Sequence, residues 1–132
     1  MTQMNTDQNG LILSDQSYAI IGAAMAVHNE LNAGFAEAVY QEAMEIELAA
    51  RGVPFERQVR LRVNYKGRQL EAEFIADLIC YGTTIVELKA VREKHKYFEA
   101  QIINYLRATG LKLGLIINFG DPGRLDWQRF VR

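Results

Sequence analysis

Two spacings of apolar residues divide the chain, a helical spacing before Pro54 and mostly a strand spacing after it. Apolar residues recur every three or four positions from Asp15 to Leu31, so we predict a first helix there. A second helix is predicted from Phe35 to Arg51, with a buried stripe formed by Val39, Ala43, Ile46 and Ala50. The short break at 32–34 predicts that the two helices pack as antiparallel neighbours.

Beyond Pro54, apolar and polar residues alternate as they do in half-buried β-strands. We predict strands at 59–65, 70–80 and 84–90, then a helix at 94–108, and finally strands at 113–118 and 125–131. The order is helix, helix, three-strand meander, helix, strand, strand. It predicts an α/β fold in which helices flank a central mixed β-sheet.

Composition narrows the class of protein. The chain has 132 residues, 49% of them apolar, which suits one globular domain. We expect a flexible polar tail at 1–14 and a single domain at 15–132. Cys80 is the only cysteine, and neither a signal pattern nor a membrane span is evident, which favours the cytoplasm and no membrane partner. A formal net charge of -1 excludes a strongly basic nucleic-acid-binding protein, so a phosphate-binding surface must be local or come from a partner.

Three charged residues interrupt the predicted buried strands. Asp77 lies alone among apolar residues, and Glu87 and Lys89 share one face of the next strand because they are two positions apart. If the turn is the three residues 81–83, Asp77 falls opposite Glu87, and two like charges placed in this way destabilise a sheet. A hard cation such as magnesium would remove that cost, and Lys89 could orient or deprotonate an attacking water.

A purely structural interpretation explains the same pattern. Acids and lysines two positions apart are common on solvated sheet faces, where they form salt bridges. A short acid-acid-lysine spacing also has many chance matches. The pattern by itself therefore leaves the metal site and the salt-bridged strand as alternatives.

The wider sequence resembles a known family. Asp77 followed by Glu87-Leu88-Lys89 is similar to the active-site motif of the PD-(D/E)XK nuclease superfamily, and 34–40 resembles the signature of the GxxExxY protein family within it. The likeness extends from about Ser17 to Val131. It also includes Ile20-Ile21-Gly22-Ala23-Ala24, Glu99-Ala100-Gln101 and 113–119.

This resemblance implies a central mixed sheet of the restriction-endonuclease type and a magnesium or manganese cofactor. It implies that Asp77 and Glu87 are metal ligands, helped by Glu37 and the backbone carbonyl of Leu88, and that Lys89 is the catalytic lysine. The proline that usually precedes the first acid is Ala76 here, and the Gly-Pro-Gly of many members is replaced at 32–34. Neither change affects the acids.

Gln101 and Tyr105 resemble the Gln-x-x-x-Tyr motif of RecB-like exonucleases, in which the glutamine would position Lys89 or a phosphate. A half-buried polar pair between helix and sheet is the alternative. For the remaining residues with suggestive chemistry, we expect structural roles. These roles are packing beside the site for Tyr40, a satisfied histidine for His28, core or interface for Trp127 and a buried thiol for Cys80.

Arg92, Lys94, His95 and Lys96 form a basic run close to Lys89. Runs of charge are usually solvated surface, but this one is near enough to the candidate site to meet a phosphate backbone.

Two functions follow from these features. The first is a metal-dependent phosphodiesterase, a hydrolase of nuclease type that acts on DNA or RNA. The second is a nuclease-fold binding module or assembly subunit with weak or no activity, which the small size and slightly acidic charge favour. The sequence also leaves open a homodimer or a larger protein assembly.

Overall fold

The structure is a computed structural model that describes the backbone of residues 2–93 and 96–132, and the side chains of 14–93 and 96–132. Its helices are α1 (Thr2–Leu31), α2 (Glu37–Ala50) and α3 (Lys96–Thr109). Its strands are β1 (Phe55–Tyr65), β2 (Arg68–Cys80), β3 (Thr84–Lys89), β4 (Leu113–Asn118) and β5 (Asp126–Val131). The predicted α/β fold and element order are confirmed.

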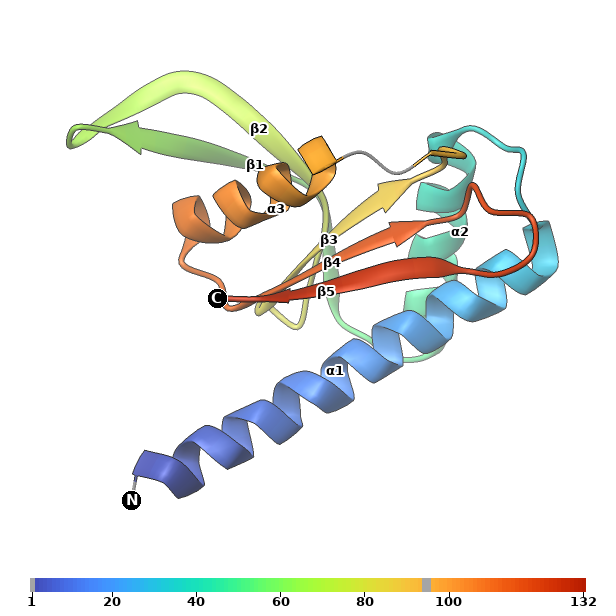
Figure 1. Ribbon diagram of the computed structural model, residues 1–132, viewed down its shortest axis with the longest axis horizontal. Coiled ribbons are helices and arrows are strands. Elements are labelled where there is room, and N and C mark those ends of the chain that lie inside the picture. The colour runs from blue at the N-terminus through green and yellow to red at the C-terminus, as the bar shows by residue number, and fades with distance from the viewer. Residues whose placement is uncertain (1, 94–95) are drawn as a thin grey trace.

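The five strands form one mixed sheet in the order β1-β2-β3-β4-β5. All neighbouring strands are antiparallel except β3 and β4, which are parallel and are joined by the α3 crossover. Figure 1 shows α1 and α2 on one side of the sheet and α3 on the other. Two apolar clusters match these layers, because Leu78, Val86 and Leu115 pack toward α1 and α2 while Ile79, Ile85 and Ile116 pack toward α3.

In both β1 and β2, the regular alternation of side chains between the two faces of the sheet is broken at one position. Leu78 packs on the α1–α2 side, yet Ala76, two residues away, packs on the α3 side. In β1, Phe55 packs on the α1–α2 side and Val59, four positions later, packs on the α3 side. A regular strand would place each of these pairs on one face. The reversal coincides with Asp77 in β2 and with the opposite position in β1, and the strand pairing skips this level.

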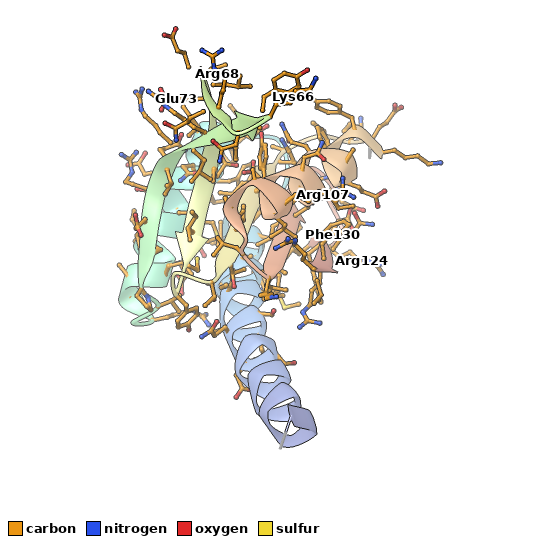
Figure 2. The ribbon with its side chains drawn as sticks, turned by 90° about the vertical axis from the view of Figure 1, so that its left-hand side faces the viewer. Lys66, Arg68, Glu73, Arg107, Arg124 and Phe130 are labelled. Carbon is orange, nitrogen blue, oxygen red and sulfur yellow. The ribbon has the colours of Figure 1, made fainter. Side chains whose placement is uncertain are left out.

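Beyond this reversal, the hairpin formed by residues 59–76 bends away from the other strands; we call it the arm. Figure 1 shows the arm arching over α3. Val59 and Leu61 pack in the α3 cluster, but every residue from Arg62 to Glu73 is exposed. Figure 2 shows Lys66 and Arg68 at the tip of the arm and Glu73 on the side away from α3.

Three details of the predicted elements were wrong. α1 begins at Thr2 rather than Asp15, and the turn-forming pair Asn9-Gly10 does not interrupt it. The helix therefore includes the predicted tail, while the division into tail and domain stays a prediction. β1 begins at Phe55 rather than Val59.

The third error is the buried face of α2. Tyr40, Met44 and Leu48 are fully buried, whereas Ile46 is 65% exposed. Both faces of this helix have apolar residues at helical spacing, and the one with the larger side chains packs on the sheet.

Candidate active site

The two acids of the predicted site meet where β2 separates from β3. Cys80 pairs with Thr84 as predicted, and the pairing runs through Leu78 and Val86 before it stops. At the next level, the carboxyl groups of Asp77 and Glu87 form a hydrogen bond with each other. The site therefore begins where the backbone pairing of β2 with β3 ends and the two carboxyl groups contact each other instead.

Glu87 is the more deeply buried acid, with only 5% of its surface exposed. Burial, followed by the charge of Asp77, raises the pKa of Glu87 to about 8. The Oε1 atom of Glu87 has no hydrogen-bond partner in the part of the chain that the structure describes. A buried oxygen without a partner is costly, so this atom is a natural contact for a bound cation or a proton donor.

Asp77 is held by backbone and side-chain contacts from three elements. One carboxylate oxygen, Oδ2, accepts a hydrogen bond from the backbone N–H of Leu88 at 2.8 Å. The backbone carbonyl of Asp77 accepts one from the side-chain amide of Gln41 in α2 at 3.1 Å. Burial raises the pKa of Asp77, and the Leu88 bond and the charge of Lys89 oppose that rise.

Gln58 is a member of the site that the sequence did not reveal. It lies opposite Asp77 in β1, has a left-handed backbone with φ of 48°, and donates a side-chain hydrogen bond to the Asp77 carboxylate. A non-glycine residue in this conformation costs about 1–2 kcal/mol. Strain of this kind is often retained where it orients functional groups.

Gln58 gives a test that separates strain from positioning. We expect Gln58→Gly to be about 1 kcal/mol more stable than Gln58→Ala, because only glycine accepts the positive φ without strain. Both variants lose the bond to Asp77, so any cleavage activity should fall by a similar factor of about five to ten, as expected for one lost hydrogen bond. Thermal melts and cleavage rates measure the two effects. If the Gly variant is instead clearly more active than the Ala variant, in line with its higher stability, Gln58 does not position Asp77.

Lys89 ends β3 beside the two acids. Its Nζ atom lies 4.4 Å from the centre of the Phe98 ring in α3, and its positive charge lowers the pKa of Asp77, Glu87 and Glu37. A cation over an aromatic face is stabilised by the electrons of the ring. Phe98 therefore helps to hold the ammonium group close to the carboxylates.

The chain beyond Lys89 is clasped by Asn118 at the end of β4. The Asn118 side chain accepts from the backbone N–H of Val91 at 3.0 Å and donates to the Val91 carbonyl at 2.9 Å. The backbone of Gly120 approaches closely here, because any side-chain carbon at that position would overlap the Val91 carbonyl. Sequence analysis missed Asn118, although a polar residue that ends an apolar strand was a visible signal.

Glu37 is the first residue of α2 and lies in a cleft of about 570 Å³ that Asp77 also lines. Burial raises the pKa of Glu37, the charge of Lys89 opposes that rise and the charge of Asp77 adds to it. Tyr40 stacks on Phe119 at 4.5 Å, and its hydroxyl donates to the carbonyl of Asn32. The predicted packing role of Tyr40 is thus confirmed, because it braces the loop that leads into α2.

Gln101 reaches the site through Tyr105. The Gln101 side chain donates a hydrogen bond to the Tyr105 hydroxyl, one helical turn away. Burial and the charges of Glu87, Tyr97 and Asp77 raise the pKa of Tyr105 to about 12. Tyr105 also stacks on Phe74 of the arm at 4.0 Å. This pair therefore joins α3 to both the arm and the acids.

Other suggestive residues lie outside this group. His28 bonds the backbone carbonyl of Asp121 at 2.8 Å, which confirms a satisfied histidine. Cys80 is fully buried as predicted, and burial raises the pKa of its thiol to about 12. Trp127 is 41% exposed on β5, so a core position is wrong. In the basic run, Arg92 and Lys96 are exposed, whereas Lys94 and His95 lie outside the described residues.

Comparison with known proteins identifies the family. A family model described as the PD-(D/E)XK nuclease superfamily matches residues 14–130. The chain belongs to the PD-(D/E)XK nuclease superfamily. No curated protein sequence matches it.

A solved structure shares the superfamily fold of this chain. The crystal structure of SSO0001 aligns with a TM-score of 0.59 over 72% of this chain, at 18% sequence identity. The alignment covers 49% of SSO0001, so this chain matches about half of that protein's length. At this identity the likeness concerns the fold alone.

PD-(D/E)XK nucleases generally use divalent metals, and the donor atoms here fit such an ion in part. Two facing carboxyl groups and the unpartnered Oε1 of Glu87 are oxygen donors of the kind that magnesium and manganese accept. Among the side chains that the structure describes, however, no three His, Cys, Asp or Glu residues gather closely enough to hold a metal. Glu37 therefore shares the cleft with Asp77 without completing a three-carboxylate site.

No helix in the described ranges is both long and apolar enough to cross a bilayer.

Proposed function

We propose that this chain is a divalent-metal-dependent phosphodiesterase, a nuclease that cleaves DNA or RNA with magnesium or manganese. The Asp77–Glu87 carboxyl pair carries the proposal, because Asp77 is half-buried, Glu87 is buried, and one Glu87 oxygen has no hydrogen-bond partner among the described residues. An acid pair in a sheet interior is destabilising unless something positive or a proton lies between the groups. Membership of a nuclease superfamily gives the pair its chemical interpretation.

Each residue has a proposed role. Asp77 and Glu87 would hold the metal, with the backbone carbonyl of Leu88 as a further oxygen donor, and Glu37 would act through a water across the cleft. The ion would supply Lewis-acid stabilisation of the phosphate charge. Lys89 would orient the attacking water and, as a positively charged ammonium group, neutralise charge on the phosphate, while Gln101 would fix the Tyr105 hydroxyl that faces the acids.

Three finer features stay proposals. The signature at 34–40 supports the GxxExxY family within the superfamily. A cytoplasmic location and a homodimer or larger assembly are expectations from the sequence.

The alternative is a nuclease-fold binding module or assembly subunit with weak or no activity. It is favoured by one observation, that the described acids do not gather in threes around a metal position. A net charge of -1 also gives the whole chain little general attraction for nucleic acid.

Cleavage of labelled oligonucleotides tests the proposal against this alternative. Single-stranded DNA, duplex DNA and RNA would each be incubated with the protein in manganese, in magnesium and in a chelator. We expect cleavage of at least one substrate with either metal and none with the chelator. The Glu87→Gln variant serves as the control for a contaminating nuclease. Binding without cleavage in every metal condition would favour the binding module instead.

A further inference from the structure

A groove lies between the arm and α3, on the face of the sheet opposite α2. We call it the arm–α3 groove; its volume is about 480 Å³, and its walls include Val63, Asn64, Phe74, Asn104, Tyr105 and Arg107. Val63 comes from the exposed part of the arm, and Asn104 and Arg107 come from the exposed side of α3. The part of the groove that these three residues line is therefore accessible to a ligand.

The groove leads toward the candidate active site. Tyr105 lines it and also packs against the apolar cluster that contains Ala76, the residue before Asp77. The charge of Glu87 also acts on the Tyr105 hydroxyl. The stacked pair of Tyr105 and Phe74 forms the base of the arm where it crosses α3. A chain molecule lying in the groove would thus have the acid pair at one end and the arm tip at the other.

Charge distinguishes this groove from the cleft on the α2 side. That cleft is lined by four carboxylates and one arginine, and the arginine is ion-paired to Glu45 at 2.9 Å. The arm–α3 groove has Arg107 and no carboxylate among its described lining residues. A polyanion is repelled by the first surface and attracted by the second.

The arm itself is charged unequally on its two faces. Glu73 faces away from α3, where Arg60 and Arg62 lie 3.6 Å and 3.9 Å from its carboxylate. In Figure 2, Lys66 and Arg107 lie toward the α3 side, opposite Glu73. Neither of these two cations has an ion pair within the described ranges.

The lining chemistry suits unpaired bases. Val63 and the aromatic pair offer apolar surface, and the amides of Asn64 and Asn104 can donate and accept hydrogen bonds. A single strand exposes base faces and edges to such groups, whereas a duplex conceals its base faces in the stack.

We propose that the arm–α3 groove binds a single strand of nucleic acid, with Arg107 and Lys66 on its phosphates, and leads it to the Asp77–Glu87 pair from the α3 face. This inference rests on the proposed function, because it identifies the path of that substrate. It also explains how a protein with a net charge of -1 can hold a polyanion beside two carboxylates.

Fluorescence anisotropy with labelled oligonucleotides in a chelator measures binding without cleavage. The full chain would be titrated against single-stranded DNA, single-stranded RNA and duplex DNA of equal length. Arg107→Glu and Lys66→Glu reverse the two proposed contacts. Arg124→Glu is the matched control, because Arg124 is also exposed but lies in the β4–β5 loop at the opposite end of the molecule from the arm (Figure 1).

We expect single strands to bind more tightly than duplex, and each groove variant to weaken that binding about tenfold at low salt while the control changes it little. Arg107→Gln should lower the salt dependence of log K by about 0.7, the value of one phosphate contact on a single strand. Far-UV circular dichroism of each variant verifies the fold.

Two results would contradict the proposal that the arm–α3 groove binds a single strand. One is an equal affinity of Arg107→Glu and Arg124→Glu, and the other is tighter binding of duplex than of single strands. If the parent cleaves nucleic acid and either result is found, the inference fails and the proposed function stands. If the parent binds through the groove but never cleaves, the binding role of the groove is supported and the proposed nuclease activity is wrong. If the parent neither binds nor cleaves nucleic acid, both the groove inference and the proposed function are wrong.

Discussion

Replacement of Lys89 by alanine should reduce cleavage about a thousandfold while metal affinity changes only a few-fold. General acid–base assistance contributes about a hundredfold to ten-thousandfold in rate, and Lys89 is the cation beside the acid pair. Because its charge also lowers the pKa of Asp77 and Glu87, the variant should bind metal slightly less well near neutral pH. Cleavage rates and manganese titrations measure the two effects.

Lys89→Arg shows which role the lysine has. Arginine keeps the positive charge but does not release its proton, so it restores a purely electrostatic function and not proton transfer. Lys96→Ala, at an exposed lysine that begins α3, is the matched control. A Lys89→Ala protein that cleaves as fast as this control would show that Lys89 is not catalytic.

The second large effect concerns the stability of the metal-free protein. The pKa of Glu87 is raised from its ordinary value of 4.5 to about 8 in the folded state. Between these values the folded protein binds more protons than the unfolded chain, so the free energy of unfolding should fall as pH rises from about 4.5 to about 8 and then level off. Asp77 and Glu37 contribute in the same direction, since the pKa of each is also raised.

Glu87→Gln should remove most of that decline. The glutamine amide can donate to Asp77 as the protonated carboxyl does, so at pH 8 the variant should be more stable than the parent by a few kcal/mol in order of magnitude. Excess manganese should stabilise the parent by binding its folded state and should stabilise the variant much less.

Thermal melts of both proteins at pH 5 and pH 8, each with a chelator and with manganese, test these statements. Glu42→Gln, at an exposed acid of the cleft that Glu37 and Asp77 line, is the control for a general loss of negative charge. A structural salt bridge predicts the opposite result, in which Glu87→Gln is less stable at pH 8 and manganese has no effect on either protein.

The fold and the meeting of the two acids followed from sequence because both depend on periodicity. The limits of β4 were predicted without error, since five consecutive apolar or small residues and a final asparagine are bounded by turn signals on both sides. The pairing of Cys80 with Thr84 followed from the length of one turn, and it brought Asp77 to Glu87. Both features can be predicted from residues that lie close together in the sequence.

Features that depend on three-dimensional packing could not be read from the pattern. Nothing about Gln58 distinguishes it from a glutamine in a regular strand, because its positive φ arises from the reversal of both strands around Asp77. The alternation of Val59, Leu61, Val63 and Tyr65 correctly indicated a strand. It did not reveal that α3 covers only the first two residues, since that depends on where a later helix ends.

The Asn118 clasp has a consequence for the exchange of amide hydrogens with solvent. Strand ends normally open locally, and their amides exchange quickly. The Val91 N–H, two residues beyond the end of β3, is instead bonded to a side chain that is 7% exposed. That hydrogen can exchange only when β3 and β4 separate, so the slowly exchanging core extends past Lys89 to the chain segment that leaves the site.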